Sequence, residues 1–351
     1  MDRGHSVRYM VMGQSKSEDH RRLKPSVMPV SLLDRVASWF RDAKRDDYFY
    51  CSRRTIPSLR AMWREIFGFK PDLAIIRPFY SYFTCFALLV FILLGTQIVL
   101  YTQTPKYKRK MCWRDRRNIF VITKLLRWKL FTVVERIEGE DEYVDLNPEK
   151  HFIPFAHSAD KSAIGRQYEL ELPRILVIGK FEPRKNYTAL LKAFTLVEFP
   201  YRLTIIGQNT TRAHAEEYAR VMKCIEAMGL SEHVSVYQNQ THDYVREQYL
   251  KHDVLVLPSF DEPASVSQLE AMAHGMAVII CRENGTANYV EHERNGLLCE
   301  RSANSLAGSL NYLLASPHLI EIYGRESRVV LKEKCSPQIV CAQLEQLFKT
   351  Y

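Results

Sequence analysis

The pattern of apolar and polar positions between residues 174 and 281 predicts alternating strands and helices. Short, continuous apolar runs rich in Val, Ile and Leu are typical of strands buried in a parallel sheet. Such runs lie at 174–179, 201–207, 234–237, 253–258 and 277–281. Helical patterns are predicted at 186–194, 213–228 and 242–252, around Glu270, and in the tail at 302–315 and 337–351. Repeated strand–helix units of this length predict an α/β, doubly wound parallel sheet.

An uncharged stretch at 78–105 allows two interpretations. Its apolar core approaches the length of about 20 residues that a transmembrane helix needs, so one interpretation is a single membrane span near 79–101. In the other, Gly95 ends a buried helix at 80–94 in a strand–helix–strand unit. The two strands of that unit are expected at 72–77 and 97–102. The polar residues that follow Gly95 favour the second interpretation, because they suit strand ends better than a bilayer centre.

The composition indicates a globular chain of two domains. The 351 residues are 46% hydrophobic and 25% charged, which excludes a disordered chain. A polar linker around 137–173 places the domains at 1–150 and 151–351. The first 30 residues are charged throughout and lack the apolar segment of a signal peptide. The eight cysteines show no C-x-x-C spacing, and four in apolar patterns predict buried, reduced thiols of a cytosolic protein: Cys85, Cys224, Cys281 and Cys341.

The net charge of +9 is concentrated in the N-terminal part. Residues 106–129 hold ten basic residues against one acid, Asp115, and carry Tyr107, Trp113 and Trp128 among them. Such a segment suits an anionic membrane surface, at about 1 kcal/mol per basic residue. A solvated basic face is the plainer alternative. No recognisable nucleic-acid module accompanies the charge, so nucleic acid is not expected as a partner.

Two glutamates carry the most informative chemistry. Glu262 follows the apolar run at 253–258, and Glu270 stands eight residues further on, in the next predicted helix. In open α/β sheets, ligands bind at the carboxyl ends of the strands, and Glu262 stands at such an end. The plainer alternative is a loop carboxylate followed by a solvated helix residue.

The start of the helix that carries Glu270 can be predicted. Ser265 and Gln268 have the spacing of a capping box, and Gly275 can close the helix. The free amides around Val266 and Ser267 then point out of the helix N-terminus, which is a ready site for a phosphate group.

The residues around the glutamates resemble a known family. Glu262-x7-Glu270 is followed by Ala-Met-Ala-x-Gly275, and 257–259, 284–286 and 293–298 add Leu-Pro-Ser, Asn-Gly-Thr and Glu-Arg-Asn-Gly-Leu-Leu. This pattern is similar to the signature of family-4 retaining glycosyltransferases of the GT-B fold. The variant Glu-Pro-Ala-Ser-Val-Ser most resembles bacterial surface-polysaccharide members. The resemblance covers 173–314 and is weaker before that.

The resemblance implies two Rossmann-like doubly wound domains that face each other across a cleft. Residues 1–150 would be the acceptor-side domain. No Gly-Gly turn follows the predicted strand at 7–13, so either this domain is reduced or its first strand is missing from the sequence. Residues 151–351 would be the donor-binding domain, and its last helix would cross back to the first domain.

The resemblance also implies roles for single residues. Lys180 and Lys185, with Arg184 as a third cation, would neutralise the donor diphosphate. Glu262 would stabilise oxocarbenium charge on the transferred sugar, and Glu270 would bind the ribose hydroxyls. The remaining donor contacts would be made by backbone groups and by the space at a strand end, at Ser265, Val266, Ser267 and Gly207. A solvated basic turn stays the alternative for the three cations.

The sequence thus predicts a metal-independent retaining glycosyltransferase, since no Asp-x-Asp pair offers carboxylates to a metal. It would move a hexose from a UDP- or GDP-linked nucleotide-sugar to a lipid-linked or polysaccharide acceptor, in the synthesis of a surface glycan such as lipopolysaccharide. It needs no cofactor, and its expected place is the inner face of the cell membrane, bound peripherally. The alternatives are a catalytically impaired, membrane-associated scaffold and a nucleotide-sugar epimerase.

Overall fold

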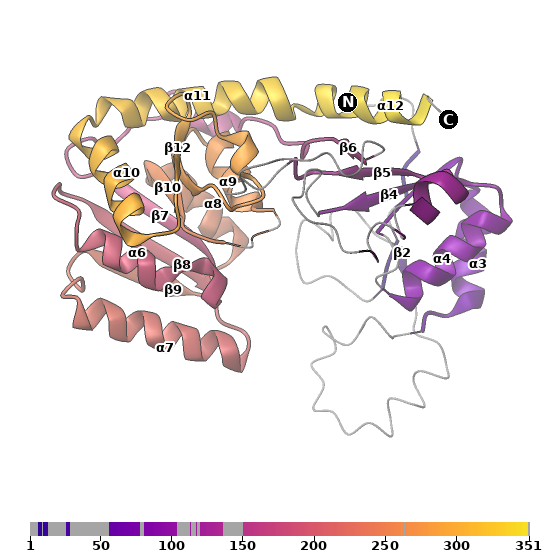
Figure 1. The fold of residues 1–351 in the computed structure, drawn as a ribbon, viewed down its shortest axis with the longest axis horizontal. Helices are drawn as coiled ribbons and strands as arrows, with labels where there is room; N and C mark the ends of the chain where they lie inside the picture. Colours follow the sequence, from indigo (N-terminus) through magenta and orange to yellow (C-terminus); the bar gives the residue numbers. More distant parts are fainter. Residues whose placement is uncertain are drawn as a thin grey trace. The chain divides into compact units, whose positions relative to one another are not determined.

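A computed structural model describes residues 6–8, 10–12, 26–28, 56–77, 81–103, 113, 117, 120–135, 150–260, 262 and 264–349. The chain has two compact α/β units (Figure 1). The first comprises Met1–Thr102 and Arg117–Phe131, and the second comprises Gln103–Arg116 and Thr132–Tyr351. Both units contain parallel strands, as the sequence predicts, and the domain bounds 1–150 and 151–351 stay a prediction.

The second unit is built on a six-stranded sheet in which all neighbouring strands are parallel. The strands are β7 (Arg174–Lys180), β8 (Arg202–Gln208), β9 (Val234–Gln238), β10 (Val254–Leu257), β11 (Ala277–Cys281) and β12 (Gly296–Cys299). Their order is β12-β11-β10-β7-β8-β9, so the chain runs to one side of β7 and then returns to the other. The switch point between β7 and β10 is where open α/β sheets bind ligands.

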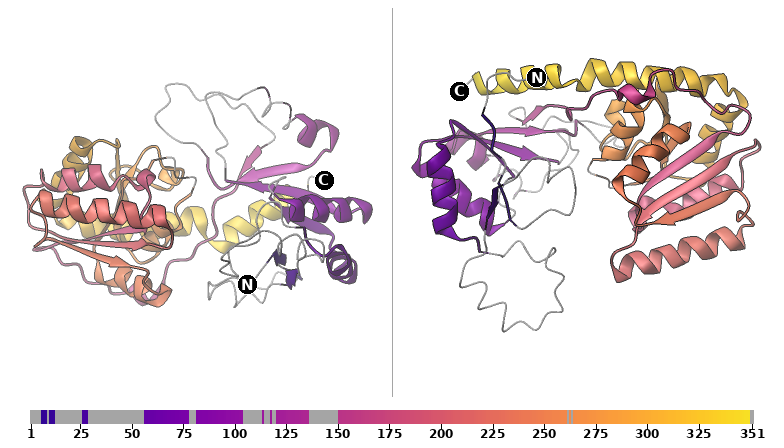
Figure 2. Two further views of the ribbon diagram at one scale, coloured as in Figure 1. Left: turned by 90° about the horizontal axis from the view of Figure 1, so that it is seen from below. Right: turned by 180° about the vertical axis from the view of Figure 1, so that it is seen from behind.

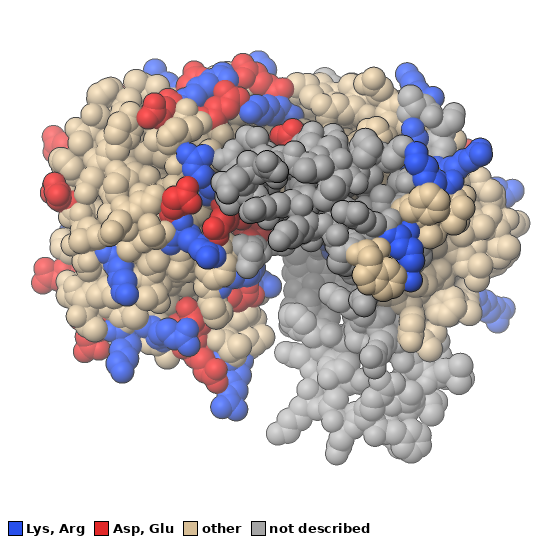
Figure 3. Space-filling model, in the orientation of Figure 1, with Lys and Arg blue, Asp and Glu red and all other residues tan. Residues whose placement is uncertain are grey.

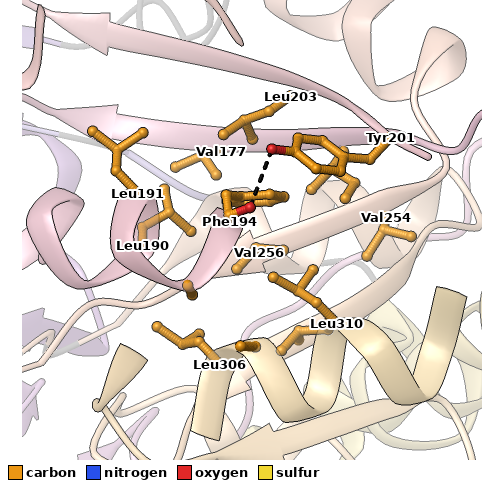
Figure 4. Packing of buried hydrophobic residues seen from close by; sticks show 14 of the residues in the cluster. Val177, Leu190, Leu191, Phe194, Tyr201, Leu203, Val254, Val256, Leu306 and Leu310 are labelled. Carbon is orange, nitrogen blue, oxygen red and sulfur yellow. Dashed lines mark hydrogen bonds between the residues drawn. The ribbon is translucent and has the colours of Figure 1, made fainter. Parts of the chain in front are cut away.

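Helices cover both faces of this sheet (Figure 2). They are α6 (Tyr187–Phe194), α7 (Arg212–Ala227), α8 (His242–Lys251), α9 (Val266–Ala273), α10 (Ala303–Ala315) and α11 (His318–Cys335), and α12 (Pro337–Lys349) follows α11 along the chain. Successive strand residues serve opposite faces: Val177 packs with α6 and α10, whereas Leu176 packs with α9 and α11. Figure 4 shows the core on the face that contains Val177, α6 and α10. There the Tyr201 hydroxyl donates to the Phe194 carbonyl oxygen at 3.3 Å.

The strands and helices predicted between 174 and 281 and the helices α10 and α12 are confirmed. The sequence analysis missed β12 and α11. The buried residues of α11 do have helical spacing, with Ile320, Tyr323, Ser327 and Val330 fully or nearly buried. Charged residues on its exposed side interrupt the apolar pattern, and they gather there in Figure 3.

The first unit contains a strand–helix–strand unit at the predicted place. Helix α4 (Tyr82–Leu93) joins β3 (Leu73–Ile76) to the parallel strand β4 (Gln97–Thr102), and Gly95 adopts a φ of 69° after the helix. The first unit also contains β1 (Met10–Met12), β2 (Ser26–Met28), α3 (Leu59–Phe69) and most of β5 (Lys129–Thr132), whereas β6 (Lys150–Phe152) belongs to the second unit. The four-stranded sheet has the order β3-β4-β5-β6.

The predicted span near 79–101 is therefore divided between a helix and a strand. Helix α4 has 12 residues, or about 18 Å at 1.5 Å per residue, well short of the roughly 30 Å of a bilayer core. In the part of the chain that the structure describes, no helix combines the length and apolarity needed to cross a membrane. Half of the basic segment 106–129, and residues 136–149 of the predicted linker, lie outside the described residues.

The cysteine prediction is partly wrong. Cys281 is buried, as predicted, but Cys224 and Cys341 are half-buried and Cys85 is exposed. Cys85 lies on the outer side of α4, whose apolar residues continue around the helix, so the sequence pattern does not distinguish its two sides.

Candidate active site

A pocket of about 510 Å³ opens at the carboxyl ends of β7 and β8 and beside the start of α9. Eight of the nine candidate residues line it: Lys180, Arg184, Lys185, Gly207, Glu262, Ser265, Val266 and Ser267. Glu270 does not line it but lies one turn after Val266, on the same side of α9. The structure therefore brings the predicted residues together at the switch point of the sheet.

The turn after β7 aims two cations into the pocket. A short 3-10 turn, Pro183–Lys185, follows the strand, and Asn186 ends it with a φ of 56°. Gly179 makes room for the Lys185 side chain, since a Cβ at this position would lie 2.9 Å from Lys185 Cε. The sequence analysis missed Gly179, although a glycine at a strand end just before a basic turn is a readable signal.

Glu262 is the centre of the charged groups. Its Oε2 accepts hydrogen bonds from Lys185 Nζ and from Arg184 Nη1. Glu262 and Lys185 are buried, and a buried carboxylate keeps its charge only when such partners compensate for lost water. Burial alone would lower the pKa of Arg184, but the carboxylates of Glu262 and Glu182 raise it, so the guanidinium stays charged.

Glu182 and His214 support Arg184 from its other side. Arg184 Nε donates to Glu182 Oε2 at 2.7 Å, and His214 Nε2 lies 3.4 Å from Glu182 Oε1. Burial works to raise the pKa of Glu182, but Arg184, Lys180 and His214 together lower it below its ordinary value. Sequence analysis missed this pair because His214 comes from the distant helix α7.

The start of α9 differs from the predicted capping box. Ser265 is the N-cap, as predicted, but its side chain makes no cap hydrogen bond and its Oγ lies 2.9 Å from Ser267 Oγ. Gln268 is fully buried and bonds Thr286, donating to its carbonyl oxygen at 2.9 Å and accepting from its hydroxyl at 2.6 Å. The capping-box prediction is wrong because the core binds Gln268. The first amides of α9 face the pocket without a side-chain cap from Ser265.

The turn at Asn284, Gly285 and Thr286 is hydrogen-bonded to the segment that carries Glu262 and to helix α9. The Gly285 amide donates to the Glu262 carbonyl oxygen at 2.8 Å, and Asn284 Oδ1 accepts from the Thr286 amide and hydroxyl. Through these bonds the turn fixes both Glu262 and Gln268, so its role here is structural.

Glu270 has its own partners. Its Oε2 accepts from the Tyr249 hydroxyl at 2.7 Å, and its Oε1 lies 3.7 Å from His242 Nε2. Burial, and then the charge of Glu270, raise the pKa of Tyr249 well above its ordinary value. Tyr249 is another residue that was not predicted from the sequence, since a tyrosine in an amphipathic helix gives no signal of this contact.

Gly207 lines the pocket, where the sequence analysis expected its missing side chain to leave space for the donor. A Cβ there would lie 2.2 Å from the Phe181 ring, so the space beside Gly207 is filled by an aromatic side chain. Among the described residues, no group of three or more His, Cys, Asp or Glu side chains could hold a metal ion.

The fold and this pocket define a doubly wound α/β class, and comparison with known proteins specifies it. Residues 163–332 match the family model of glycosyl transferases group 1, which is a family of transferases. Sucrose-phosphate synthase of Zea mays is 27% identical over 161 residues, which is 42% of this chain and 15% of that protein. Human alpha-1,3/1,6-mannosyltransferase ALG2 is 27% identical over 187 residues, which is 48% of this chain and 43% of that protein. The chain spans less than half the length of these curated relatives.

Solved structures with this fold cover nearly the whole chain. A glycosyltransferase from Rickettsia africae ESF-5 has a TM-score of 0.70 and 13% identity, with 96% of this chain and 88% of that chain covered. Anabaena HepE in complex with UDP-glucose has a TM-score of 0.64 and 12% identity, with 95% and 88% covered. At these identities the likeness shows the fold, which is GT-B with two Rossmann-like units.

Proposed function

We propose that the protein is a metal-independent retaining glycosyltransferase that moves a hexose from a UDP- or GDP-linked donor. One observation carries the proposal: Arg184 and Lys185 converge on Glu262 beside the uncapped N-terminus of α9. Two cations and a row of amides suit a diphosphate, and a carboxylate among them suits a sugar that becomes positively charged.

The chemistry follows from these charges. The bond between the anomeric carbon and the phosphate oxygen breaks, and its electron pair leaves with the diphosphate. Arg184, Lys185 and the exposed Lys180 stabilise that charge, with the amides of Val266 and Ser267 at the helix N-terminus. Glu262 stabilises the oxocarbenium charge while the acceptor hydroxyl forms the new bond and passes its proton to the departing diphosphate oxygen. Glu270 binds the ribose hydroxyls.

The proposal also includes the acceptor and the place of the protein in the cell. A lipid-linked or polysaccharide acceptor at an anionic membrane is supported by the basic residues at 106–129. The Glu-Pro-Ala-Ser-Val-Ser variant at 262–267 supports a role in surface glycans such as lipopolysaccharide. Anabaena HepE was solved with UDP-glucose, which supports a UDP-linked hexose as the first donor to test.

The test is a panel of UDP- and GDP-sugars, with binding and slow hydrolysis measured in EDTA and with added Mg²⁺ or Mn²⁺. We expect one donor to bind equally with and without metal, Glu262→Gln to stop its hydrolysis, and Glu270→Gln to weaken its binding. Glu216→Gln, on an exposed helix position, is the matched control and should change neither. Binding of no donor under any condition favours the scaffold alternative, and conversion of the free donor to its epimer favours the epimerase.

A further inference from the structure

The Tyr249 hydroxyl joins the core of the second unit to one carboxylate at the edge of the site. It donates to Glu270 Oε2 at 2.7 Å, while the Tyr249 ring is buried and stacks on His274 at a centroid distance of 5.3 Å. The Glu270 side chain remains 26% exposed, so Oε2 is held by the core while Oε1 lies 3.7 Å from the exposed His242.

Satisfying a buried hydroxyl does not require a carboxylate. Four other tyrosines donate to backbone carbonyl oxygens instead: Tyr168 to Gly275, Tyr187 to Lys180, Tyr201 to Phe194 and Tyr289 to Val133. A buried tyrosine needs some acceptor, and a backbone carbonyl serves at no cost in charge. The pairing of Tyr249 with a partly exposed carboxylate is therefore a feature of this place in the fold.

The direction of this hydrogen bond is fixed. Burial and the charge of Glu270 raise the pKa of Tyr249 well above its ordinary value, so the hydroxyl keeps its proton and donates. A donor bonded to an ionised carboxylate makes one of the stronger hydrogen bonds in proteins. It holds Oε2 and leaves Oε1, 3.7 Å from His242, toward the exposed side.

We propose that Tyr249 is a positioning residue for donor binding, because it fixes Glu270 in the orientation that accepts the ribose hydroxyls. The proposal rests on the proposed function, in which Glu270 binds the ribose. Without the Tyr249 hydroxyl the glutamate side chain regains rotamer freedom, which it must lose again when a nucleotide binds.

The test compares two ligands that differ only at the ribose, UDP and 2′,3′-dideoxy-UDP, and the corresponding GDP pair, on the full chain. Tyr249→Phe keeps the buried ring and removes the hydroxyl. We expect it to weaken binding of the ribonucleotide about tenfold, the size of a lost hydrogen bond to a charged group, and to leave the dideoxynucleotide unchanged. Tyr201→Phe is the matched control: it also loses a buried hydroxyl bond, and it should change neither dissociation constant.

A double-variant cycle supplies the second measurement. Glu270→Gln should reduce the preference for ribose, and Tyr249→Phe should reduce it no further in that background, because the two residues act as one unit. An equal loss for both nucleotides, or no loss for either, would overturn the positioning role while the ribose preference of the wild type keeps the proposed function. A wild type that binds neither nucleotide would overturn the proposed function and the inference with it.

Discussion

At the scale of single residues, the two glutamates of the motif are held in different ways. Glu262 is buried and bonded by two cations, whereas Glu270 is partly exposed and bonded by a neutral hydroxyl. A carboxylate and the two cations bonded to it compensate for the water that each loses on burial. In Glu270, whose Oε2 is bonded by a tyrosine, Oε1 lies 3.7 Å from the exposed His242. The two glutamates therefore have different surroundings, which suit them to different roles.

The substitution Gly179→Ala tests whether the position of Lys185 matters for donor binding. In Gly179→Ala the new Cβ would meet Lys185 Cε at 2.9 Å, so the flexible lysine must move away from Glu262. We expect donor binding to weaken about tenfold with little change in stability, measured as a dissociation constant and a Tm. Gly308→Ala is the control, because its Cβ meets nothing within 4 Å in α10. It should stabilise the protein by about 0.5–1 kcal/mol and leave binding unchanged.

Buried histidines predict a pH dependence of stability. Burial lowers the pKa of His252 below its ordinary 6.5, so the unfolded chain binds this proton more strongly than the folded one. Stability is therefore fully present above pH 6.5 and falls as the pH drops from there toward the lowered pKa, by up to about 1.4 kcal/mol per unit for one proton. Denaturant unfolding between pH 5 and 7.5 measures this slope. His252→Gln should make it shallower, and an unchanged slope would contradict the assignment.

At the scale of elements, features that depend on the residues of a single strand or helix could be predicted from the sequence. Features that depend on a contact with a distant segment could not. Strand β10 was predictable because all four residues are buried and apolar. The capping box failed because Gln268 bonds Thr286, which is 18 residues away. The contact of Tyr249 with Glu270 likewise joins two helices, and no local spacing encodes it.

Two helix starts provide a matched comparison of this point. The Thr241 side chain caps α8 by accepting from the Tyr244 amide at 3.2 Å, whereas Ser265 makes no such bond at α9. We expect Thr241→Ala to cost about 1 kcal/mol in the free energy of unfolding and Ser265→Ala clearly less. Donor binding should respond in the opposite order, since Ser265 lines the pocket. Denaturant titration and donor titration of both variants check the two expectations, and equal stability losses would show that Ser265 caps its helix after all.

At the scale of the whole molecule, the uneven distribution of charge predicts that the protein binds an anionic membrane surface. The net charge is +9, and Lys106, Lys108, Arg109 and Lys110 form the densest part of the basic segment, outside the described residues. Each basic residue near an anionic surface contributes about 1 kcal/mol, and salt weakens the attraction. Changing these four residues to Gln should weaken binding to vesicles that contain phosphatidylserine by at least about a hundredfold, measured by sedimentation.

The control removes the same charge from the helices α6, α7, α8 and α11. Lys192, Lys223, Lys251 and Lys332 are exposed there, and their change to Gln lowers the net charge equally. If position matters, this variant keeps most of its vesicle binding, and neither protein binds neutral phosphatidylcholine vesicles. Equal losses in both variants would mean that net charge alone attracts the protein, and then residues 106–129 are a solvated basic face. Binding that persists in 1 M salt would contradict an electrostatic cause altogether, because the Debye length there is only about 3 Å.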